Sequence, residues 1–143
     1  MKNKIIPDSN HVARYCKPTT VENNEILATA FLMRPIDGSL SVNWLEYLKL
    51  STREKEISKI QDVYNKKLKV SPMSRIAVVN VGLAREKVFS ESDDRRNIQF
   101  KHDPSKEDPS HSGIFNLKSD DEMIAELILS VVDQERHVYP AKR

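Results

Sequence analysis

Apolar residues recur at helical spacing in two segments of the chain. Over residues 52–68 a narrow apolar stripe (positions 57, 60, 64 and 68) runs among charged residues, and a Ser-x-x-Glu capping pattern at Ser51 and Glu54 precedes it. Over residues 119–133 the same capping pattern, beginning at Ser119, precedes a broader apolar stripe: Met123, Ile124, Leu127, Ile128, Val131 and Val132. We predict a surface helix over the first segment and, over the second, a helix packed on a sheet.

Strand patterns lie between these two helices and before them. Residues 40–44 alternate apolar and polar side chains, which predicts a strand with one buried face. Residues 25–34 are largely apolar and are followed by Asp37 and Gly38, a pair that favours tight turns, so we predict a β-hairpin over 25–44. Residues 75–81 are almost continuously apolar and rich in β-branched side chains, which is typical of an interior strand. Further strands are expected at 98–102 and 114–117.

The remaining segments are polar or interrupted by proline. Residues 1–24 hold few apolar side chains and include Pro7 and Pro18, so we expect an irregular arm with at most a short strand near 11–15. A loop with two prolines is expected over 103–113, and the C-terminal tail 135–143 is expected to be extended. Together the elements predict one α+β domain over residues 1–143, a mixed sheet of four or five strands with two main helices packed on it.

Composition excludes several classes of protein and site. The chain has 143 residues, enough for one domain with its own core. Only 3 residues are glycine and they lie far apart, so no Gly-rich phosphate loop is present and no cofactor is expected. No apolar run is long enough to cross a membrane, and the single Cys16 cannot form an intramolecular disulfide, which together favour a cytoplasmic protein. The net charge of +2 comes from interspersed basic and acidic residues, which supports nucleic-acid binding only weakly.

Residues 11–17 bring together several side chains that can take part in catalysis. His11 can act as a general acid or base, Cys16 can act as a nucleophile, and Arg14 with Lys17 can hold an anionic group. On a straight strand, however, His11 and Cys16 would point to opposite faces. A Cys–His pair therefore needs a bend or a histidine from elsewhere. The alternative is that Cys16 is a small buried hydrophobic residue.

Glu46 is a further candidate because it follows the only tryptophan, Trp44, by two positions. On a continuing strand both side chains would share a face. An aromatic neighbour that excludes water raises the pKa of a carboxyl group, which would suit a general acid. The alternative is that Glu46 is the polar end of a strand that reaches solvent.

Two histidines and two aspartates lie within ten positions: His102, Asp103, Asp108 and His111. Imidazole and carboxylate groups are common metal ligands, so a divalent-metal site is one hypothesis for this segment. The spacing matches no metal-binding signature, however, and Asp-Pro pairs are frequent in ordinary turns. The alternative is that His111 donates a hydrogen bond to a backbone carbonyl.

Three segments of the chain, HVARYCKP, LSVNWLEYL and DPSHSGI, resemble segments of a small family of uncharacterised bacterial proteins. The resemblance extends over most of the chain, from His11 to Pro140. It implies no activity, cofactor or catalytic residue. It implies only that the three segments work together.

The sequence leaves two functions open and does not decide whether the protein is an enzyme. The first is an accessory module that binds another protein beside a larger effector, because no cofactor loop, triad or metal signature is found. The second is a small hydrolase or transferase that acts on a nucleotide or nucleic acid through His11, Arg14, Cys16 and His111. If the protein is an enzyme, these side chains and Glu46 should converge on one pocket. If it is an accessory module, the same side chains should lie apart in the structure. We expect the N-terminal arm to pack on the loop at 108–113, with His11 or Arg14 close to His111.

Overall fold

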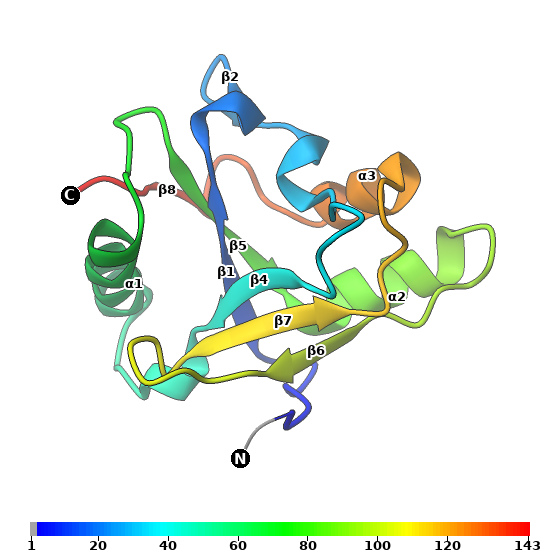
Figure 1. Cartoon of the computed structure of the whole chain (residues 1–143), viewed down its shortest axis with the longest axis horizontal. Helices are drawn as coiled ribbons and strands as arrows, with labels where there is room; N and C mark the ends of the chain where they lie inside the picture. Colours follow the sequence, from blue (N-terminus) through cyan, green and yellow to red (C-terminus); the bar gives the residue numbers. More distant parts are fainter. Residues whose placement is uncertain (1–2) are drawn as a thin grey trace.

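A computed structural model describes residues 3–143 and shows an antiparallel sheet of six strands with helices on both faces (Figure 1). The strand order is β6-β7-β4-β1-β5-β8, and every neighbouring pair is antiparallel. The sheet consists of β1 His11–Cys16, β4 Leu40–Trp44, β5 Arg75–Asn80, β6 Gln99–His102, β7 His111–Phe115 and β8 Val138–Pro140. A two-stranded ribbon is formed by β2 Val21–Glu22 and β3 Glu25–Ile26.

The helices flank the sheet on its two faces, with α1 on one side and α2 and α3 on the other (Figure 1). The α-helices are α1 Arg53–Lys67, α2 Val81–Glu91 and α3 Glu122–Ser130, and the short 3₁₀ helices are η1 Pro18–Thr20, η2 Ala28–Phe31 and η3 Glu46–Leu48. The two main helices predicted from apolar spacing are therefore confirmed. In the part of the chain that the structure describes, no helix is long and apolar enough to cross a membrane.

Both predicted helices begin at a side-chain cap, but not at the predicted serine. Thr52 caps α1 and Asp121 caps α3, and in each case the side-chain oxygen accepts a hydrogen bond from the amide three residues later, at 3.2 and 3.0 Å. The predicted Ser51 and Ser119 lie one and two residues too early. The capping pattern located each helix but not its cap, because several oxygen-bearing side chains adjoin each helix start.

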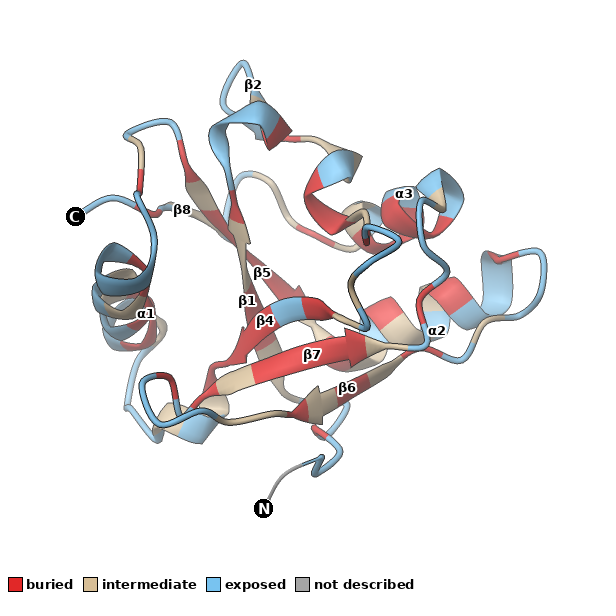
Figure 2. Cartoon of the chain, viewed as in Figure 1, coloured by how far each residue is buried: buried red, intermediate tan, exposed pale blue. Residues whose placement is uncertain are grey.

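The sheet separates two hydrophobic clusters, and Figure 2 shows buried residues concentrated along the inner strands. The cluster on the face covered by α2, α3 and η2 includes Phe31, Phe100, Ile114 and Ile128. The cluster under α1 includes Ile60, Tyr64, Ile76 and Val78. Val12 and Ala13, adjacent in β1, belong to different clusters, as the alternation of side chains along a strand requires.

The interior strand predicted over 75–81 is confirmed. β5 lies between β1 and β8, and its four central residues, 76–79, are all buried. A strand with helices over both faces has no solvent-facing side, and for this reason its residues are apolar without alternation.

The hairpin predicted over 25–44 is wrong. In the segment 25–34 only Glu25–Ile26 forms a strand, and it pairs with β2, while β4 pairs with β1 and β7. The apolar run continues as η2, whose Ala30 and Phe31 are buried beside α3. The run is apolar because it packs under a helix, and composition alone does not distinguish that burial from burial in a sheet.

The sheet has six strands rather than the predicted four or five, and it is antiparallel rather than mixed. The segment predicted as an irregular arm contributes β1, which lies inside the sheet, so the short strand near 11–15 is an interior one. The tail contributes β8, which is extended as expected and pairs with β5. Strands this short offer few positions for a period-two pattern, and a pattern within one strand does not reveal the direction of its partner.

Candidate functional site

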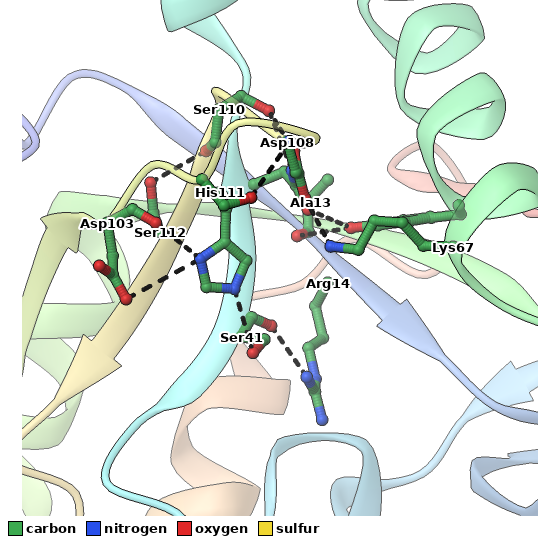
Figure 3. A network of polar contacts seen from close by, with 12 residues as sticks. Ala13, Arg14, Ser41, Lys67, Asp103, Asp108, Ser110, His111 and Ser112 are labelled. Carbon is green, nitrogen blue, oxygen red and sulfur yellow. Dashed lines mark hydrogen bonds and ion pairs between the residues drawn. The ribbon is translucent and has the colours of Figure 1, made fainter.

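The sheet splits in its middle, between β1 and β4. β1 pairs with β5 along its whole length but pairs with β4 only at Val12 and Ala13. β4 in turn stays paired with β7 from Leu40 to Asn43. Beyond Ala13 the two central strands diverge, and the side chain of Arg14 lies between them (Figure 3).

Arg14 bridges the split with hydrogen bonds to two carbonyl groups. Nη1 donates to the carbonyl of Ser41 in β4 and Nε donates to the carbonyl of Ala30 in η2, both at 2.8 Å. Within residues 3–143 no protein atom hydrogen-bonds Nη2. Burial lowers the pKa of Arg14, but a guanidinium remains charged at neutral pH. A positive charge with an unused donor therefore lies in the gap of the sheet.

A polar pocket of about 370 Å³ opens on the side of the gap that η2 covers. Besides Arg14, its wall contains the exposed cations Lys17 and Arg34 and the buried Thr20, whose hydroxyl donates to the Lys17 carbonyl at 2.7 Å. Its one carboxylate, Asp37, accepts a hydrogen bond from Arg34 at 2.9 Å, and this bond holds the pKa of Asp37 below its ordinary value. With three cations and one carboxylate in its wall, the pocket is electropositive.

A smaller pocket, of about 200 Å³, opens on the opposite side of the gap, beside α1. Arg14 and Ser41 line both pockets, and Lys67 and His111 join them in the smaller one. We call the two pockets, together with the Arg14 side chain between them, the strand-gap site.

His111 is oriented by a hydrogen bond on each side of its ring. Nδ1 lies 2.9 Å from the carbonyl oxygen of Asp103, and Nε2 lies 3.3 Å from the hydroxyl oxygen of Ser41 (Figure 3). A carbonyl can only accept, so in the neutral ring Nδ1 carries the proton and Nε2 carries the lone pair. The alternative expected for this histidine, a hydrogen bond to a backbone carbonyl, is observed.

A buried polar network lies behind the smaller pocket (Figure 3). The buried carboxylate of Asp108 accepts hydrogen bonds from Lys67 Nζ at 2.7 Å and from Asn43 Nδ2 at 2.8 Å. The hydroxyl of Tyr64 donates to Asn43 Oδ1 at 2.9 Å, and burial raises the pKa of Tyr64. The network joins α1, β4 and the loop before β7, so it holds Lys67 in place beside the gap.

His11 and Glu46 form a separate pair outside both pockets. Glu46 Oε2 lies 2.7 Å from His11 Nδ1, and Glu46 Oε1 accepts a hydrogen bond from the His11 amide at 2.7 Å. Burial on its own would raise the pKa of Glu46, but the hydrogen bonds from His11 outweigh it and the pKa lies below its ordinary value. Of the two alternatives for Glu46, the raised pKa beside Trp44 is not found, because the hydrogen bonds from His11 lower it; β4 ends at Trp44 and Glu46 belongs to η3.

We expect the free energy of unfolding to depend less on pH in the acid range in Glu46→Gln than in the wild type. The pKa of Glu46 is lower in the folded chain than its ordinary 4.5, so the carboxylate contributes stability that is fully present above pH 4.5 and is lost as the pH falls through the folded value. The measurement is the urea midpoint of both proteins between about pH 3 and 7, with the exposed Glu107→Gln as control. Identical slopes for wild type and Glu46→Gln would contradict the lowered pKa.

Cys16 lies in the hydrophobic core and in neither pocket. Its side chain is fully buried, and burial raises the pKa of the thiol to about 12. An inaccessible neutral thiol is a poor nucleophile. Cys16 is therefore a small buried hydrophobic residue, which is the alternative stated for it above.

Hydrogen bonds to other partners separate the candidate metal ligands. His102 Nε2 lies 2.7 Å from the carbonyl of Pro109, and Asp108 is engaged in the buried network. Asp103 and His111 are neighbours, with 4.0 Å between the Asp103 carboxylate and Nδ1 of the ring. Among residues 3–143 no group of three or more histidine, cysteine, aspartate or glutamate side chains is placed to hold a metal ion.

The five candidate catalytic residues therefore lie in three places. Arg14 and His111 meet at Ser41, which agrees with the expected approach of arm and loop. The other three lie apart: His11 with Glu46, and Cys16 in the core.

Sequence reasoning missed several members of the strand-gap site, among them Ser41 and Lys67. Ser41 is an ordinary polar position in an alternating strand, and Lys67 is one of several lysines on α1. No local pattern distinguishes either residue. Their role depends on the split between β1 and β4, which is a property of strand pairing.

The three segments singled out by resemblance are neighbours in the sheet. They contain β1, β4 and β7, which are adjacent in the order β7-β4-β1. Arg14, Ser41 and His111 come one from each segment. Comparison of the chain with models of protein families, with curated proteins and with solved structures finds no match. The resemblance to a bacterial family stays a prediction, and the chain is assigned to no family.

Proposed function

We propose that the protein is a binding module for an anionic small molecule, and that its strand-gap site receives a phosphate group of that molecule. The observation that carries the proposal is the Arg14 guanidinium, charged and with Nη2 unbonded by any atom of residues 3–143, at the base of an electropositive pocket. Guanidinium and ammonium groups bind phosphate through charge-assisted hydrogen bonds. The larger pocket, about 370 Å³, falls within the size range of small-molecule sites.

The dispersal of the other candidates also supports a binding module. His11 and Cys16, which the enzyme hypothesis required beside Arg14, line neither pocket. Lys17 and Arg34 extend the positive charge of the larger pocket to its rim, where they would attract an anion from solution. A nucleotide or another phosphate-bearing metabolite fits this chemistry.

Isothermal titration with inorganic pyrophosphate and with ATP tests the proposal. We expect both to bind, and we expect Lys17→Ala to weaken binding severalfold, since this exposed residue contributes charge without supporting the fold. Arg14→Lys should weaken binding about tenfold, because an ammonium cannot reproduce the planar guanidinium fork. Higher salt should weaken binding of the wild type.

Lys106→Ala is the matched control, because Lys106 is exposed and outside the strand-gap site. It removes the same charge as Lys17→Ala and should leave affinity unchanged. Absence of binding at millimolar pyrophosphate and ATP would overturn the proposal. An equal effect of Lys17→Ala and Lys106→Ala would also overturn it, since only the overall charge would then matter.

An apolar groove between η2 and α3 supports a second candidate function, the binding of a partner protein. The groove has a volume of about 590 Å³ and is lined by Leu27, Leu32 and the half-exposed Met123, with Glu122 and Glu126 beside them. This combination suits a partner segment that is apolar with flanking basic residues.

A helical peptide of leucine and lysine should bind the wild type and not Met123→Glu. Equal binding by both proteins would exclude the groove.

A further inference from the structure

Ser41 and His111 form a hydrogen-bonded pair whose polarity suits nucleophilic catalysis. The Asp103 carbonyl, 2.9 Å from Nδ1, places the proton of the neutral ring on Nδ1. Nε2 therefore presents its lone pair to the hydroxyl of Ser41, 3.3 Å away. The Asp103 carboxylate, 4.0 Å from Nδ1, would stabilise the imidazolium that forms when the ring takes the serine proton. This arrangement of nucleophile, base and orienting group is the one that activates serine in hydrolases.

The strand register holds the pair together and leaves it accessible. Ser41 lies opposite Gly113, and His111 lies opposite Asn43, so the serine and the histidine are diagonal neighbours on β4 and β7. Gly113 contributes no side chain beside the exposed Ser41. A Cβ atom at this glycine would lie 2.8 Å from Ser39 Oγ and 2.9 Å from the Phe115 ring, so a larger residue does not fit without movement. These neighbours fill the space beside Gly113, whereas Ser41 itself is exposed and lines the smaller pocket, so a substrate approaches its hydroxyl from that pocket.

A positive charge lies beside Ser41. Arg14 Nη1 donates to the carbonyl of Ser41 itself at 2.8 Å, and Lys67 lines the same pocket of about 200 Å³. Lys67 is paired with the Asp108 carboxylate at 2.7 Å, so Arg14 is the cation that favours a substrate with an anionic group. The arrangement is partly enclosed by Tyr64 and Leu68 of the α1 segment.

We propose that the smaller pocket hydrolyses carboxylic esters that carry an anionic group, with Ser41 as nucleophile and His111 as general base. Ser41 Oγ bonds to the carbonyl carbon while its proton moves to His111 Nε2. The bond from that carbon to the alcohol oxygen then breaks, and the alcohol leaves with the proton from Nε2. Water attacks the acyl-serine, gives a proton to Nε2, and releases the carboxylic acid as that proton returns to Ser41. Only water is consumed, so the step needs no further co-reactant.

Covalent labelling tests this activity independently of anion binding. An alkyl fluorophosphonate should add one phosphonyl group to the wild type, detected by intact mass and located on Ser41 by peptide mapping. Ser41→Ala should abolish labelling, and His111→Ala should slow it about 100-fold, the effect expected for loss of a general base. With the spontaneous rate of each ester subtracted, the mono-4-nitrophenyl ester of adipic acid should be hydrolysed faster than 4-nitrophenyl hexanoate, because only the former carries a carboxylate.

Ser90→Ala and His137→Ala are the matched controls, because both residues are exposed and lie outside the strand-gap site. Both variants should label at the wild-type rate. Thermal melts of Ser41→Ala and His111→Ala establish that each variant is folded. Absence of labelling in the wild type, or labelling that persists in folded Ser41→Ala, would overturn the proposal. Pyrophosphate binding that survives either result would leave the binding module standing and remove only the esterase.

Discussion

Asp108→Ala should lower the free energy of unfolding by about 3 kcal/mol, at the lower end of the range for breaking a buried ion pair. The carboxylate is buried and accepts hydrogen bonds from Lys67 and from the buried amide of Asn43. Alanine leaves both donors without this acceptor. Lys67 is partly exposed and recovers hydration, whereas Nδ2 of the buried Asn43 side chain keeps only its hydrogen bond to Ser110 Oγ.

Urea denaturation of Asp108→Ala and of Glu107→Ala checks this expectation. Glu107 is the preceding residue in the same loop and is exposed, so its loss should change the midpoint very little. The Asp108 variant should also slow fluorophosphonate labelling, because the network that fixes Asn43 of β4 and Lys67 beside the smaller pocket would be broken. Equal midpoints for the two variants would show that the network does not stabilise the fold.

Leu127→Ala should lower the free energy of unfolding by about 2–5 kcal/mol, the cost of truncating a buried leucine. Leu127 is 8% exposed and lies in the cluster on the α2 and α3 face, with Ile128 beside it fully buried. This loss of stability is the sum of the transfer free energy of the removed methyl groups and the cost of the cavity that remains. The measurement is a denaturant melt with the midpoint and slope fitted together.

Met123→Ala provides the comparison on the same helix. Met123 is 50% exposed, so truncation should change stability by about half a kcal/mol or less. A loss below about half a kcal/mol for Leu127→Ala as well would mean that α3 does not pack on the sheet. The contrast also separates stability from partner binding, since Met123 lies in the groove and Leu127 does not.

Local patterns predicted much of the secondary structure. The helices α1 and α3 and the strands β4, β5 and β6 all fall where apolar spacing placed them, because burial of one face or of both imposes a period on the residues themselves. The errors occur where burial has another cause. The run ending at Phe31 is apolar because it packs beside α3 and not because it forms a strand. The interior strand β1 was predicted as part of an irregular arm; it carries the charged Arg14, which the split between β1 and β4 accommodates.

The candidate site shows the same division. Arg14 and His111 were identified from residue type, since guanidinium and imidazole groups are chemically able to bind and to exchange protons. Ser41 and Lys67 were not, because a serine on a strand and a lysine on a helix are ordinary surface residues. Cys16 and Glu46 were candidates by type, and their surroundings changed their chemistry: burial raises the pKa of one, and hydrogen bonds from His11 lower the pKa of the other.

The sequence by itself determined the α+β class, the two main helices and the interior position of β5, because these follow from the period and extent of apolar positions. Only the tertiary structure decided that β1 and β4 part after Ala13 and that Arg14 fills the space between them. Strand order and register arise from pairing between segments far apart in the chain, and a pairing leaves no local periodic trace in either partner. The meeting of Arg14, Ser41 and His111 is a consequence of that pairing.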